Sequence, residues 1–131
     1  IDFYPTLLEL CGIPASKQRK IDGESLVPLL GGVQQSKRKS LFWHYPHYSN
    51  QGGFPGGAVR SGDWKLIERY EDGRKHLYHL GDDVGEMNDV ARTHPELVKK
   101  MSADLHEWYQ EVDAKFLRPK SDGPSPWVPS P

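Results

Sequence analysis

The chain has 131 residues, with 17 basic and 18 acidic side chains and a formal net charge of -1. This length suffices for one modest domain with its own core, and the balanced charge argues against a nucleic-acid partner, which needs a basic excess or stripe. No apolar run is long enough to span a membrane. The single cysteine, Cys11, excludes an internal disulfide framework and a cysteine-based zinc site.

The first predicted element is a short helix near the start of the chain. Asp2 is a good N-cap, Pro5 falls in the first turn and Gly12 is placed to end the helix. Cys11 is interpreted as a buried residue of this helix, because a free cysteine behaves as a small hydrophobe.

A short apolar stretch, Ser25 to Leu30, is predicted to form a single helical turn, and residues 33–40 read as a linker. The linker carries the only basic run, Lys37-Arg38-Lys39. Because runs of charge usually lie on solvated surfaces, we interpret it as an exposed loop in preference to a phosphate or sulfate site.

Four antiparallel strands are predicted in the middle of the chain. They are runs rich in aromatic and branched side chains, bounded by turn residues, at 41–45, 58–61, 64–70 and 76–80. The turn at 71–74 contains an Asp-Gly pair, which readily takes the positive φ angles of a tight hairpin. Residues 46–57, PHYSNQGGFPGG, are too rich in glycine and proline for a strand and are predicted to form a long loop.

The clearest periodicity predicts a long helix at residues 94–113. Its apolar residues recur at spacings of four, four, three and four, namely Leu97, Met101, Leu105, Trp108 and Val112. Thr93 and Glu96 are spaced as a capping box, with Pro95 in the first turn. The single apolar stripe needs a partner, so we predict an α+β fold in which this helix covers one face of the four-stranded sheet. Trp127 is the expected anchor of a Pro-rich tail at 118–131.

Three blocks of sequence match a known family in order. The first is DFYPTLLELCGI at 2–13, followed by DGESLVPLL at 22–30. The second is Arg60-x-Gly62-x-x-Lys65-Leu66-Ile67 with Leu77-Tyr78-x-Leu80, and the third is Asp83-x-x-Glu86. Together these blocks resemble the C-terminal region of sulfatases of the arylsulfatase A type, which belong to the alkaline-phosphatase-like superfamily.

The resemblance implies a division of the chain. Residues 1–32 would be a helical remnant, the C-terminal end of the sulfatase α/β domain, and residues 33–117 would be the C-terminal subdomain. The chain has no initiator methionine and opens directly into a helix, so we expect a fragment of a longer protein whose N-terminal catalytic α/β domain is its partner. The parent is expected to be a sulfuric ester hydrolase, periplasmic or secreted, although these residues carry no signal that shows its compartment.

The chemistry implied by the resemblance needs a formylglycine, made within a C/S-x-P-x-R motif, and a Ca²⁺ or Mg²⁺ ion. Cys11 is followed by GIPA, so its proline comes one place late and the arginine is absent. No serine fits the motif either, and no set of metal ligands is apparent. The fragment alone is therefore predicted to contain no catalytic residue and no metal site.

The acidic segment around Asp82, Asp83 and Glu86 is interpreted as turn and cap chemistry in preference to a calcium loop, because its spacing does not match an EF-hand. The resemblance implies that Asp83 caps backbone N–H groups and that Glu86 pairs with a neighbouring base. Val84 stands where the family usually has proline.

The segment from Phe42 to Tyr48 combines aromatic rings with two histidines. Such side chains suit a sugar that carries sulfate, through ring stacking and polar tips. We hypothesise that His44, His47, Tyr48 and Asn50 contact the leaving group of the substrate, a sulfated carbohydrate. The competing interpretation is that they are packing and surface residues of the first strand.

Three further possibilities stay open. Arg60 and Lys65 match family positions, but pairing with Glu68 or Asp63 is the simpler account of both. The chain could also be a module that binds sulfated glycans without hydrolysing them. Finally, the apolar face of the helix at 3–11, without its partner domain, could drive formation of a homodimer.

Overall fold

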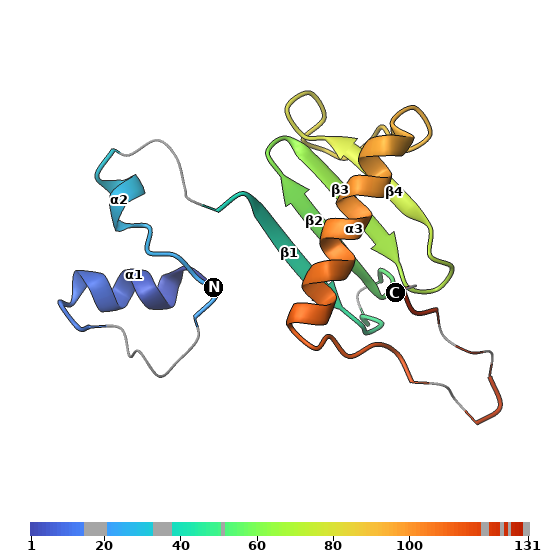
Figure 1. Ribbon diagram of the computed structural model, residues 1–131, viewed down its shortest axis with the longest axis horizontal. Coiled ribbons are helices and arrows are strands. Elements are labelled where there is room, and N and C mark those ends of the chain that lie inside the picture. Colours follow the sequence, from blue (N-terminus) through green and yellow to red (C-terminus); the bar gives the residue numbers. More distant parts are fainter. Residues whose placement is uncertain are drawn as a thin grey trace. The chain divides into compact units, whose positions relative to one another are not determined.

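The computed structural model describes residues 1–14, 21–32, 38–50, 52–118, 121–123, 125 and 127–129. The chain divides into two compact units, Ile1–Lys39 and Ser40–Pro131 (Figure 1). Within the described residues, no helix is both long enough and apolar enough to cross a membrane.

The first unit contains two short helices, α1 at Phe3–Leu10 and α2 at Val27–Leu30. Thr6 is buried, and its hydroxyl donates to the Asp2 carbonyl oxygen at 2.6 Å and accepts from the Leu26 N–H at 2.9 Å. The Asp2 carboxylate accepts the Glu24 N–H at 2.9 Å. These bonds join the two N-terminal sequence blocks to each other.

Asp2 occupies the predicted N-cap position of α1, but its side chain does not cap the helix. Both of its carboxylate oxygens instead accept hydrogen bonds from the Arg38 guanidinium, at 2.8 and 2.6 Å. The bond from Arg38 is the main reason that the pKa of Asp2 lies well below its ordinary value. The prediction of a solvated loop is therefore wrong for Arg38, while Lys39 is exposed, as predicted, and Lys37 lies outside the described residues.

The first unit leaves much of α1 uncovered by the described residues. Cys11 is exposed, so the prediction that it is buried is wrong. Several large apolar side chains of this unit are exposed as well, namely Ile1, Phe3, Leu7, Leu10, Ile13 and Leu30. Only Thr6 of the helix is buried, because the described segment before α2 contacts α1 on that side.

The second unit contains an antiparallel sheet of four strands in sequence order: β1 at Ser40–Tyr45, β2 at Gly56–Ser61, β3 at Trp64–Arg69 and β4 at Lys75–His79. The four predicted strands are confirmed. β2 begins earlier than predicted, because Gly56 and Gly57 pair with Arg69 and Glu68 of β3. The loop between β1 and β2 is correspondingly shorter than the glycines suggested.

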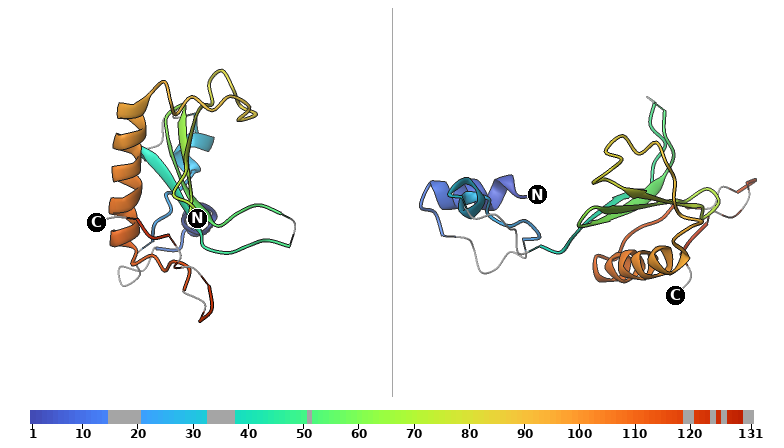
Figure 2. Two further views of the ribbon diagram at one scale, coloured as in Figure 1. Left: turned by 90° about the vertical axis from the view of Figure 1, so that its right-hand side faces the viewer. Right: turned by 90° about the horizontal axis from the view of Figure 1, so that it is seen from above.

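Helix α3, Pro95–Glu111, lies along one face of this sheet (Figure 2). The predicted α+β fold is therefore confirmed. The core consists of residues from both layers: Val59, Leu66, Tyr70, Leu77, Met101, Leu105 and Tyr109. Val112, predicted to belong to the apolar face, is 43% exposed, and Tyr109 takes the buried position instead.

The N-terminus of α3 differs from the predicted capping box. His94, not Thr93, is the N-cap, and no side chain caps the helix. The Thr93 hydroxyl donates to the Val90 carbonyl oxygen at 2.9 Å. Because Pro95 is the first helical residue, Thr93 lies one position too early to cap it.

The C-terminal tail is held to the second unit through Trp127, as predicted. Its ring stacks on that of Tyr70, with centroids 5.8 Å apart and an interplanar angle of 11°. Trp127 also covers Gly73, where a Cβ atom would lie 2.5 Å from the indole nitrogen. Gly73 has a φ of 68°, as expected for the hairpin turn between β3 and β4.

Candidate functional site

The candidate site is the end of the sheet from which the β1–β2 loop emerges. Here the register aligns His44, Gly57, Glu68 and Lys75 in one row across the four strands. Side chains alternate along a strand, so this row lies on the same face as the buried Leu66, two positions before Glu68. That is the face covered by α3. The row lies at the end of the sheet next to the β1–β2 loop, so we call it the base of the loop.

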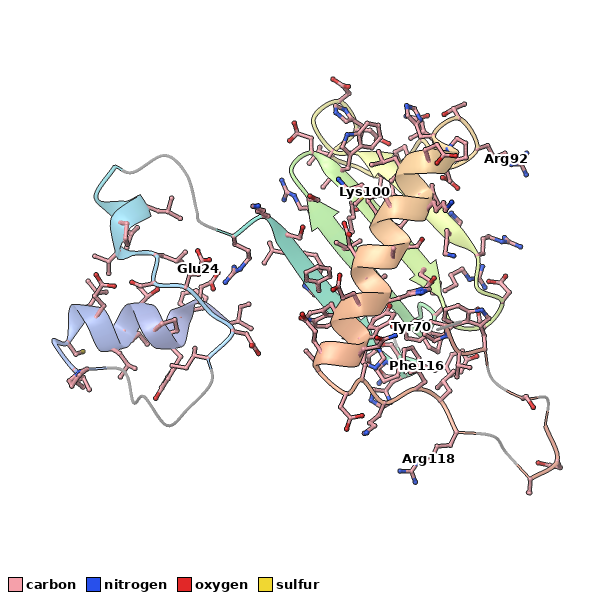
Figure 3. All side chains as sticks on the ribbon, in the orientation of Figure 1. Glu24, Tyr70, Arg92, Lys100, Phe116 and Arg118 are labelled. Carbon is pink, nitrogen blue, oxygen red and sulfur yellow. The ribbon has the colours of Figure 1, made fainter. Side chains whose placement is uncertain are left out.

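His44 is held by contacts within the chain. Its Nε2 donates to the Lys115 carbonyl oxygen at 2.9 Å, and its Nδ1 lies 2.6 Å from the Tyr70 hydroxyl oxygen. The ring also contacts Tyr109 and Phe116, with centroid distances of 5.5 and 5.0 Å. Figure 3 shows Tyr70 and Phe116 close together near the C-terminal end of α3.

The hydroxyl oxygens of Tyr70 and Tyr109 lie 2.8 Å apart in the interior next to His44. Burial is the main cause that raises the pKa of both phenols, so both remain neutral hydrogen-bonding groups. The resulting network fastens the last residue but one of β1 to the segment that follows α3. The contacts of His44 thus favour a role in holding the base of the loop.

His47, Tyr48 and Asn50 lie outside this network, and all three are exposed. The ring of His47 meets that of Tyr45 edge to face, with centroids 5.5 Å apart. The Tyr48 hydroxyl donates to Glu71 Oε1 at 3.1 Å, and this bond is the main cause that raises the pKa of Tyr48. The structure therefore places three of the four predicted site residues on one exposed limb of the loop and His44 in the packing below.

The same row of residues contains a buried carboxyl group, that of Glu68, which the sequence patterns did not predict. The Glu68 side chain is 0% exposed, and its two oxygens lie 2.9 and 3.0 Å from His106 Nε2. Lys75 Nζ is 3.5 Å from Oε1. The available signal was strand alternation. Glu68 lies two positions after the buried Leu66 of β3 and two positions before the buried Tyr70, so alternation places it on the inward face.

The predicted partners of Arg60 and Lys65 are wrong. Lys65 Nζ is 2.5 Å from Glu86 Oε1, and Arg60 Nε donates to the Gly62 carbonyl oxygen at 3.2 Å. Alternation explains the difference, because residues 65 and 68 of β3 point to opposite faces of the sheet.

The acidic segment between β4 and α3 is a built turn. Asp83 accepts the N–H groups of Met87 and Asn88 at 3.0 and 2.8 Å, as predicted. Glu86 pairs with Lys65, as predicted, and has a φ of 55°. In the described part of the chain, no three His, Cys, Asp or Glu side chains are grouped so that they could hold a metal ion.

Residues 1–114 match the family model of the N-sulphoglucosamine sulphohydrolase C-terminal domain. The chain belongs to this sulfatase family. The match spans both units and includes all three blocks on which the resemblance to sulfatases rests.

Several sulfatases are similar to this sulfatase domain in sequence. A "Sulfatase" of Formosa agariphila is 35% identical over 122 residues, which cover 82% of the chain and 22% of that protein. Human Arylsulfatase K is 31% identical, with 81% of the chain and 21% of that protein covered. Human Arylsulfatase A is 35% identical, with 83% and 21% covered. The chain thus spans about a fifth of the length of these relatives.

Solved structures show the same fold. BT4656 in complex with its substrate D-glucosamine-2-N,6-O-disulfate has a TM-score of 0.70 and 27% identity, with 86% of this chain and 24% of that chain covered. BT1596, a 2-O GAG sulfatase, has a TM-score of 0.72 and 24% identity, with 86% of this chain and 25% of that chain covered. The second likeness concerns the fold alone.

The sulfatase sequence blocks have structural explanations in this domain. Asp2 and Thr6 bind the segment before α2, and Asp83 and Glu86 order the turn before α3. Gly23 allows a close backbone contact, since a Cβ atom there would lie 2.1 Å from the Ile1 carbonyl oxygen. These blocks therefore identify the family through residues that build the domain.

Proposed function

We propose that the protein to which this domain belongs is a sulfuric ester hydrolase and that the domain borders its substrate pocket. The observation that carries this proposal is the β1–β2 loop of a sulfatase domain, which presents His47, Tyr48 and Asn50 to solvent above a firmly held base. The domain shapes the pocket and does not perform the bond cleavage.

The exposed limb suits the sugar part of a sulfate ester. Tyr45 and Tyr48 are 52% and 64% exposed, and a pyranose can stack on exposed aromatic rings through its C–H groups. The His47 imidazole and the Asn50 amide offer donors and acceptors for sugar hydroxyls. A sulfated sugar as the substrate class is supported by BT4656, whose substrate is D-glucosamine-2-N,6-O-disulfate.

The N-terminal catalytic α/β domain would supply the formylglycine, which would attack the sulfur. It would also hold the Ca²⁺ or Mg²⁺ ion, which would stabilise the sulfate oxygens. The described residues of this chain do not fit the metal, because none of their His, Cys, Asp or Glu side chains form a group of three. The domain's own contribution is to bind and orient the leaving group.

The same catalytic domain is the proposed partner of the first unit. Phe3, Leu7 and Leu10 of α1 are 77%, 58% and 61% exposed, which is unusual for large apolar side chains of a soluble helix. The relatives are much longer than this chain, so the N-terminal domain of the same protein is the natural cover for this face.

The test is His47→Ala, and separately Asn50→Ala, in the full-length protein. We expect kcat/KM on its best sulfated sugar to fall about tenfold, and kcat/KM on a small aryl sulfate, which has no sugar to reach the loop, to change less than about twofold. His94→Ala is the matched control, because His94 contacts Trp64 at the opposite end of β3 from the loop. Unchanged sugar kinetics in both loop variants would remove the loop from the site.

A second candidate function rests on the exposed face of α1. Without a partner domain, its apolar side chains would bury one another, so the isolated fragment would form a homodimer. Light scattering on the isolated fragment shows whether it is a homodimer, as this second proposal requires, or a monomer. Glycan-array binding by the same fragment would instead support a module that recognises sulfated glycans without hydrolysing them.

A further inference from the structure

The two limbs of the β1–β2 loop are each fastened to the same short segment of the neighbouring hairpin. On the outgoing limb, residues 46–50, the Tyr48 hydroxyl donates to Glu71. On the returning limb, residues 52–55, the Phe54 ring lies under the Arg69 guanidinium, whose central carbon is 4.8 Å from the ring centroid. Two positions separate these attachment points on the hairpin.

The attachment points are also joined to each other. Arg69 and Glu71 form an ion pair, and their side chains are 25% and 33% exposed. The Glu71 carboxylate thus receives both the guanidinium of Arg69 and the hydroxyl of Tyr48, through separate oxygens. A continuous chain of contacts runs from one limb of the loop through the ion pair to the other limb.

The segment that carries this ion pair is rigidly supported. The Arg69 N–H donates to the Arg74 carbonyl oxygen at 2.9 Å, and the Gly73 N–H donates to the Arg69 carbonyl oxygen at 2.9 Å. Between the two charged residues, Tyr70 is 0% exposed, and its N–H donates to the Pro55 carbonyl oxygen at 2.9 Å. The hairpin end is therefore a fixed support against which the loop can be held.

We propose that Arg69 and Glu71 are positioning residues that clamp the two limbs of the β1–β2 loop together and so orient His47 and Asn50 toward the sugar. This inference rests on the proposed function, and it assigns the orientation of the site to a pair of charges outside it. Neither charged residue needs to contact the substrate.

A surface ion pair by itself contributes little to stability, because water screens both charges. The effect expected here is local. Each member of the pair also holds one limb of the loop. Loss of either charged side chain therefore releases the limb that it holds and weakens the hold of its partner on the other limb. The glycines at 52 and 53, with φ of 94° and 96°, offer little intrinsic resistance to such a rearrangement.

The experiment compares Glu71→Ala and Arg69→Ala with the wild type in the full-length protein. Hydrogen exchange of peptides from residues 46–55 should accelerate about tenfold in both variants, because the loop opens more often. KM for the best sulfated sugar should rise about three- to tenfold, while kcat/KM for a small aryl sulfate stays within about twofold. Glu107→Ala, the same change at an exposed position of α3, is the matched control and should alter neither quantity.

Tyr48→Phe is a milder variant that keeps the ring and the ion pair. It should accelerate exchange in the outgoing limb and leave the returning limb, held by Arg69, protected. Unchanged exchange of the loop in Glu71→Ala and Tyr48→Phe would overturn the clamp whatever the kinetics. Faster exchange with an unchanged KM for the sugar would overturn the orienting role, and the kinetics of His47→Ala and Asn50→Ala decide separately whether the loop lies in the pocket.

Discussion

Gly57 lies directly beneath the hydroxyl group of Tyr109, at a distance that leaves no room for a side chain. A Cβ atom at Gly57 would lie 1.8 Å from the Tyr109 hydroxyl oxygen and 2.5 Å from that of Tyr70. The glycine therefore allows two phenols from different layers to meet above the sheet. It also explains why β2 can continue through a pair of glycines that the sequence patterns favoured as loop.

Gly57→Ala should lower the free energy of unfolding by about 3 kcal/mol, because the methyl group forces Tyr109 and Tyr70 out of their buried positions. Guanidinium denaturation followed by tryptophan fluorescence measures the change. Gly85→Ala is the control, since the nearest atom to its Cβ would be Met87 Cγ at 3.5 Å, and it should change stability by less than about 0.5 kcal/mol. Equal effects of the two substitutions would contradict the steric explanation.

The contribution of His106 to the free energy of unfolding should depend on the buried carboxyl group of Glu68. His106→Leu removes the nearest hydrogen-bonding partner of Glu68 and leaves the buried carboxyl group with Lys75 alone, so it should destabilise by about 2–3 kcal/mol. In a Glu68→Gln background the same substitution should cost less than about 1 kcal/mol. A double-mutant cycle by denaturation measures the coupling, and simple additivity would show that the two side chains do not interact.

Asp2 should remain ionised far into the acid range. Its pKa is depressed in the folded state, chiefly by the hydrogen bond from Arg38, so its contribution to stability is present above the unfolded pKa of about 3.9 and is lost as the pH falls through the folded pKa. No change in this contribution is expected between pH 5 and 8. Carboxyl NMR titration should show the Asp2 midpoint rising toward its unfolded value in Arg38→Met, whereas identical midpoints in the variant and the wild type would exclude the pairing.

Trp127→Ala should release the C-terminal tail while the sheet and α3 stay folded. The substitution removes the stacking on Tyr70 and the cover over Gly73. Limited proteolysis should cut the tail several times faster, and the free energy of unfolding should fall by about 1–2 kcal/mol. Val128→Ala is the neighbouring control, because Val128 is 56% exposed, and a tail cut equally fast in the control would argue against the anchor.

Much of the fold was predictable because its signals are local. The Asp-Gly pair of the hairpin and the alternating strands act over a few residues, and α3 shows its period within a single segment. The errors arose where a local pattern had two solutions. Thr93 and His94 both precede Pro95, and only the actual helix start decides which one is the N-cap. Val112 continues the apolar spacing, but the helix ends at Glu111 and leaves it exposed.

The candidate site was predictable as a segment but not as a set of contacts. The unusual composition of β1 and its loop pointed to His44, His47, Tyr48 and Asn50, and their contact with substrate stays a prediction. The partners of His44 are 26 and 71 residues away in sequence, at Tyr70 and Lys115. No local pattern connects residues so far apart.

The sulfatase family, the order of strands and helix, and the turn chemistry of Asp83 could be read from the residues alone, because each depends on residue types at short spacings. The folded chain was needed to show that Glu68 faces His106 and that Arg69 and Glu71 join the two limbs of the loop. Those relations depend on sheet register and on the rotation of α3, which together determine which distant side chains meet.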